Sequence, residues 1–124
     1  MESETTSNVA LLRGAIVGEL ISRDLPSGST VVQFDVATTI TAGDKTAKVS
    51  VPVSWVDPPS RALDPIEQGL DVVVVGTVRR RFFRSGGSTQ SRTEVVVDAI
   101  VPTRRTKQVM ALVSDTAARV AGTL

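Results

Sequence analysis

The segment DPPSRALDPIEQG, residues 57–69, separates two valine-rich and threonine-rich parts of the chain. Asp57 followed by Pro58 is typical of a helix start, and Gly69 is typical of a helix end. Pro65 lacks a backbone N–H and therefore limits the helix to a turn or two. We expect a short helix within residues 61–68, flanked on both sides by strands.

The flanking sequence is rich in Val and Thr, which are β-branched and favour strands. The predicted strands are residues 9–21, 30–39, 46–55, 70–84 and 92–101. Gly14 and Gly18 interrupt the first strand and indicate bulges or bends. Turns are expected at residues 25–28 and 42–45, and SGGSTQS, residues 85–91, is interpreted as a flexible connection too long for a two-residue hairpin turn.

Three strands, a short helix and two strands follow one another in the order of an OB-fold, an all-β, five-stranded Greek-key barrel. Strand counting alone is also compatible with a small β-sandwich. We expect residues 1–7 to be a disordered leader, residues 8–105 the barrel domain and residues 106–124 a C-terminal amphipathic helix. The helix is predicted because apolar residues recur at helical spacing, namely Val109, Leu112, Val113, Ala117 and Val120. This stripe is expected to pack on the barrel or on a partner subunit.

The composition argues against several functions. The 124 residues include no Cys and no His, which excludes disulfides, thiolate or histidine metal sites, Cys nucleophiles and His-based triads. The carboxylates show no paired spacing, so we expect neither an enzyme nor a cofactor. No apolar run approaches the roughly 20 residues that span a bilayer, and the N-terminus, MESETTSN, is not a signal peptide. A cytoplasmic, nucleoid-associated protein without membrane contact is expected.

The charge is unevenly distributed, although the net charge of the chain is only +1. Residues 79–107 carry eight Lys and Arg against two acidic residues, a net +6, while the other residues carry six against eleven, a net −5. Such asymmetry suits a polyanionic partner, but it also occurs in a charge mixture that only keeps a protein soluble.

The predicted fourth strand contains two of the four aromatic residues of the chain, in GTVRRRFFR, residues 76–84. Alternation puts Arg79, Arg81 and Phe83 on one face and Arg80 and Phe82 on the other. An aromatic ring beside cations is what single-stranded nucleic acid requires, so Phe83 is interpreted as functional. Phe82, which shares its face with Val78, is expected to cover the end of the barrel.

Other candidate residues carry weaker signals. Alternation groups Trp55 with Val51 and Val53 and favours its burial, and Phe34 is expected in the core. Arg13 shares a strand face with Leu11 and is a candidate to point into a groove.

Several segments resemble bacterial single-stranded DNA-binding proteins of the OB-fold type. The resemblance rests on residues 8–14, on PSG at 26–28 with FDVAT at 34–38, on GTVRRRFF at 76–83 and on RTEVVV at 92–97. It covers about residues 8–105.

The resemblance implies binding of single-stranded DNA with little sequence preference, as a homo-oligomer (tetramer or dimer), in replication, recombination or repair. Phe83 matches a base-stacking aromatic, and Arg79 and Arg81 match basic positions on the same path. Trp55 falls where the family often has another stacking aromatic, in conflict with the alternation argument. Residues 85–91 are expected to form a mobile finger over the DNA, with Arg84 and Arg92 at its base.

The sequence also departs from the family pattern. Ala42 and Val49 stand where better-known members have aromatics, and AARVAGTL, the end of the chain, has no acidic tip. We therefore expect a divergent paralogue that does not recruit repair enzymes through such a tip. The alternative is an OB-fold assembly module with weak or no DNA binding.

Overall fold

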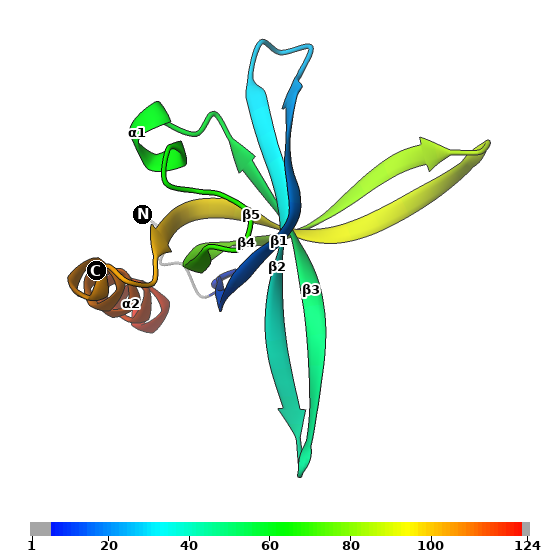
Figure 1. Cartoon of the computed structure of the whole chain (residues 1–124). Coiled ribbons are helices and arrows are strands. Elements are labelled where there is room, and N and C mark those ends of the chain that lie inside the picture. The colour runs from blue at the N-terminus through cyan, green and yellow to red at the C-terminus, as the bar shows by residue number, and fades with distance from the viewer. Residues whose placement is uncertain (1–5, 123–124) are drawn as a thin grey trace.

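Five strands form a barrel that is closed in the order β1-β2-β3-β5-β4, and the chain is an OB-fold, as predicted (Figure 1). The computed structural model describes residues 6–122, so most of the predicted leader lies outside the described residues. The elements are β1 (Ala10–Asp24), β2 (Thr30–Ala42), β3 (Lys45–Val56), α1 (Ser60–Leu63), β4 (Asp71–Ser85), β5 (Ser88–Pro102) and α2 (Thr106–Ala121). Neither helix in the described part of the chain is long and apolar enough to cross a membrane.

The barrel core consists mainly of branched aliphatic side chains, because alternate residues of each strand point inward. Ile16, Val36, Val72 and Val74 are at most 1% exposed. Phe34 is also buried, which confirms its predicted place in the core.

β1 changes its partner along its length. Residues 10–15 pair with β4, and residues 15–24 pair with β2, with an irregularity between Val17 and Ile21 where Gly18 has a φ of 74°. A Cβ atom on Gly14 would overlap the carbonyl oxygen of Ala37. The two glycines therefore allow the bend and the bulge that the sequence predicted.

The β2–β3 and β4–β5 hairpins extend well beyond the barrel (Figure 1). The prediction of a flexible connection over residues 85–91 was wrong, because Ser85 pairs with Ser88 and only Gly86 and Gly87 form the turn. Both glycines have positive φ values, 59° and 83°, as two-residue turns of type I′ require. The Gly-Gly pair was the available signal, and the polar residues that follow it continue the strand.

The segment between β3 and β4 contains a single helical turn, Ser60–Leu63, which is shorter than predicted and does not begin at Asp57. Asp57 instead takes a left-handed φ of 48°, and its Oδ1 accepts a hydrogen bond of 2.9 Å from the backbone N–H of Thr30. The N–H of Asp57 donates to the carbonyl of Thr30 at 2.7 Å. Asp57 therefore closes the end of the β2–β3 ladder.

The predicted C-terminal helix is present as α2, which ends at Gly122 with a left-handed φ of 75°. It contacts β4 and β5, and Val109 and Leu112 are half-buried. Val113 and Val120 remain 40% and 53% exposed. Only part of the apolar stripe therefore packs on the barrel.

Candidate nucleic-acid interface

The β4–β5 hairpin has one face that combines cations with an aromatic ring. Strand pairing places Arg79 opposite Glu94, Arg81 opposite Arg92 and Phe83 opposite Gln90. Residues that face each other across an antiparallel pair lie on the same side of the sheet. The predicted row of Arg79, Arg81 and Phe83, called the binding row below, therefore continues across β5 to Arg92.

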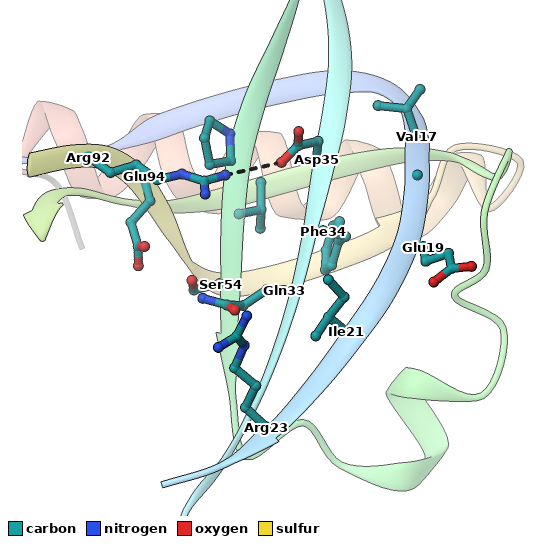
Figure 2. Close-up of a pocket in the computed structure, with 13 residues that line it drawn as sticks. Val17, Glu19, Ile21, Arg23, Gln33, Phe34, Asp35, Ser54, Arg92 and Glu94 are labelled. Carbon is teal, nitrogen blue, oxygen red and sulfur yellow. Dashed lines mark ion pairs between the residues drawn. The ribbon is translucent and has the colours of Figure 1, made fainter. Parts of the chain in front are cut away.

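The same face leads into a groove on the outside of the barrel, with a volume of about 260 Å³. Because Phe34, Val53 and Val95 point into the core, their strand neighbours point outward into this groove. Four strands, β1, β2, β3 and β5, contribute to its wall (Figure 2). Its polar and charged lining consists of Glu19, Arg23, Gln33, Asp35, Ser54, Arg92 and Glu94.

Two ion pairs organise the charges in this region. Arg92 Nη2 lies 3.6 Å from Asp35 Oδ1 and joins β5 to β2 across the groove (Figure 2). Arg81 Nε lies 3.8 Å from Oε1 of Glu94, which is 3% exposed. Both arginines remain partly exposed, at 39% and 48% of their side chains, so each has surface available for a phosphate.

The two phenylalanines are exposed on opposite faces of the hairpin. Phe83 is 40% exposed on the face of the binding row, so part of its surface is open for stacking. Phe82 is 65% exposed, which makes the prediction that it covers the end of the barrel wrong. Its side of the hairpin has no barrel interior to fill, because the hairpin extends past the point where the barrel closes (Figure 1).

Trp55 belongs to the core and is 6% exposed, so the burial predicted from alternation is confirmed. The assignment of Trp55 as a stacking residue, which came from the family resemblance, was wrong. A buried indole cannot present its face to a base without opening the barrel.

Arg13 and Arg84 lie apart from the binding row. Arg13 is opposite Val73 at the far end of β4 and forms an ion pair of 3.6 Å with Asp71. Arg84 shares its strand face with Phe82, and its Nη2 donates to the carbonyl of Gly87 at 3.4 Å. The structure therefore brings together Arg79, Arg81, Phe83 and Arg92 and leaves the other three predicted positions outside.

Sequence reasoning missed Arg23, Gln33 and Ser54 as groove residues. Arg23 lay beyond the predicted end of the first strand, and the bend of β1 carries it to the groove. Gln33 and Ser54 face each other across the β2–β3 ladder. In the sequence, each of them lies between core residues, and this alternation predicts that its side chain points outward. It does not predict which residues the side chain then faces.

Comparisons with known proteins support the fold. No protein-family model and no curated protein sequence matches the chain. The chain is similar to a solved structure described as a Plasmodium falciparum SSB complex with ssDNA, with a TM-score of 0.68 and 19% sequence identity. The match covers 82% of this chain and 98% of that one. At this level of identity, the likeness shows a shared OB-fold.

Proposed function

We propose that this protein binds single-stranded DNA with little sequence preference, along the face formed by the binding row and the groove beside it. The observation that carries the proposal is the exposure of Phe83 on the same strand face as Arg79 and Arg81. Bases of any sequence stack on an aromatic ring, and arginines neutralise the phosphates between them. Neither contact depends on the identity of the base, so such a row is expected to bind with little sequence preference.

Two further observations support the proposal. The sequence segments quoted above resemble bacterial single-stranded DNA-binding proteins, and the similar Plasmodium structure is an SSB complex with ssDNA. We infer that the protein is a divergent paralogue that acts as a homo-oligomer in replication, recombination or repair. The paralogue status, the oligomerisation and the pathway rest on the resemblance to bacterial single-stranded DNA-binding proteins.

The direct test is a titration of labelled oligo(dT) by fluorescence anisotropy at two salt concentrations. If Arg79, Arg81 and Arg92 each neutralise one phosphate, the slope of log K against log salt is about −2 for a single strand. A fourfold rise in salt then weakens binding roughly 20-fold. A duplex of the same length is the control and is expected to bind more weakly, because its bases are not free to stack on Phe83. Absence of oligo(dT) binding at low salt would refute the proposal.

A second candidate function is assembly through α2, with little or no DNA binding. It is favoured by the exposed apolar side chains of Met110, Val113 and Val120, which share one side of the helix. Light scattering of Val113→Asp, beside the unchanged protein, tests it. A fall in mass together with no oligo(dT) binding by either protein would favour this function over the first.

A further inference from the structure

The face of the β4–β5 hairpin opposite the binding row also combines an aromatic ring with cations. β4 pairs with β5 without a register shift from residue 76 to residue 85, so its residues alternate regularly between the two faces. Arg80, Phe82 and Arg84 therefore lie together on this opposite face and are called the second row below. Phe82 is 65% exposed, against 40% for Phe83 on the binding row. The second row thus repeats the pattern of ring and cations on which the proposed function rests.

The arginines of the second row have no acidic partners in the part of the chain that the structure describes. Neither Arg80 nor Arg84 forms an ion pair among residues 6–122, whereas Arg81 and Arg92 on the other face pair with carboxylates. Arg84 donates one hydrogen bond to the carbonyl of Gly87, which leaves four of its five donors. The cross-strand neighbours of the second row on β5 carry hydroxyl groups, namely Thr93, Ser91 and Thr89. This face is therefore a positively charged surface that suits a polyanion.

A second copy of this chain is a poor occupant of the same face. A two-fold contact places one patch against the identical patch of the other copy, so Arg80 and Arg84 would meet the same two residues. Like charges brought together oppose association. A single DNA strand has no such conflict, because its bases stack on an aromatic ring and its phosphates attract the arginines beside it. Charge and ring together favour a nucleic-acid strand on this face.

We propose that the second row binds a second single strand of DNA, so that one protomer bridges two strands or two segments of one long strand. This inference rests on the proposed function. The hairpin extends beyond the barrel, and Arg80, Phe82 and Arg84 are all exposed (Figure 1). Strands on its two faces are separated by the sheet and its side chains, about 10 Å in total. The Debye length is about 8 Å at physiological salt, so repulsion between the two strands is largely screened.

The second row is the weaker of the two sites. It has no groove beside it, and it offers two arginines, while the face of the binding row offers three with Arg92. The expected slope of log K against log salt is about −1.4 for the second strand and about −2 for the first. In a titration with trace oligonucleotide, the tighter face determines the measured affinity. Substitutions in the second row therefore change binding only when DNA is in excess.

The test counts DNA strands per protomer, a number that does not depend on how many protomers assemble. Oligo(dT) of about eight nucleotides, within the roughly 4–16 that one OB-fold covers, is added in excess to the full chain in equilibrium dialysis. We expect two strands per protomer on the unchanged protein. In Phe82→Ala, the dissociation constant of the second strand should rise on the order of tenfold or more, and the count should fall toward one. The matched control is Phe83→Ala, which should weaken the first strand and leave the second unchanged.

Charge variants give an independent measurement on the same protein. Arg80→Gln should reduce the magnitude of the salt slope by about 0.7 for the second strand only, and Arg79→Gln should do so for the first strand only. One strand per protomer on the unchanged protein, or an unaltered second strand in folded Phe82→Ala, would overturn the inference. A fall in mass of Phe82→Ala in light scattering would also overturn it, because this face would then join copies of the chain. If no oligonucleotide binds the unchanged protein, the proposed function fails as well, which is a different result.

Discussion

Replacement of Phe83 by Ala tests which face of the β4–β5 hairpin holds DNA. Phe83 is 40% exposed, and it lies on the strand face of Arg79 and Arg81. An aromatic side chain has roughly 200 Å² of surface, so about 80 Å² of Phe83 is available to a base. At about 25 cal/mol per Å², covering this area contributes about 2 kcal/mol, within the range of about 1–3 kcal/mol for base stacking.

The chain offers a matched control in the adjacent residue. Phe82 is 65% exposed, so Phe82→Ala would weaken binding more than Phe83→Ala if exposed apolar area alone determined affinity. We expect the reverse, because Phe82 lies on the side of the hairpin away from the binding row and the groove. The two variants therefore distinguish base stacking at a defined position from non-specific hydrophobic binding.

The assay is anisotropy of labelled oligo(dT) at fixed low salt, with thermal unfolding of each variant to confirm an intact barrel. We expect Phe83→Ala to raise the dissociation constant about 30-fold and Phe82→Ala to change it less than about threefold. Equal effects of the two variants, or a larger effect of Phe82→Ala, would show that the binding row is not the DNA-binding surface.

Three further predictions concern charge and stability. Arg79→Gln should reduce the magnitude of the slope of log K against log salt by about 0.7. Arg80→Gln, on the opposite face of the strand, should leave the slope unchanged. Equal slopes for the two variants would contradict the face assigned to Arg79. Gly76→Ala should lower the free energy of unfolding by about 3 kcal/mol in urea, because the new Cβ would overlap the carbonyl oxygen of Val96, and an unchanged midpoint would argue against this close approach. Asp57→Ala should lower the free energy of unfolding, measured by thermal unfolding, by roughly 1–2 kcal/mol. Asp57→Asn should lower it much less, because Asn keeps the acceptor for the Thr30 N–H and tolerates a left-handed backbone. Equal losses in the two variants would exclude the hydrogen bond as the cause.

The order of the elements and the burial of Phe34 and Trp55 could be predicted from the sequence. Both depend on local features, namely the alternation of branched residues, the turn residues at 42–45 and the proline-limited helix after Asp57. Alternation also predicted the burial of Trp55 correctly where the family resemblance did not. A period of two in a strand is a property of the backbone, so it holds wherever the strand is regular.

The surroundings of outward residues were decided by the tertiary structure. Phe82 and Phe83 are adjacent and chemically identical, and their exposure depends on how far the β4–β5 hairpin extends past the barrel. The groove requires four strands and the bend of β1, which brings Arg23 beside β2 and β3. Glu94 appears in the sequence as one acid among basic residues. Only the closed barrel shows that its carboxylate is buried in a groove wall, because burial depends on contacts between strands that are far apart in the chain.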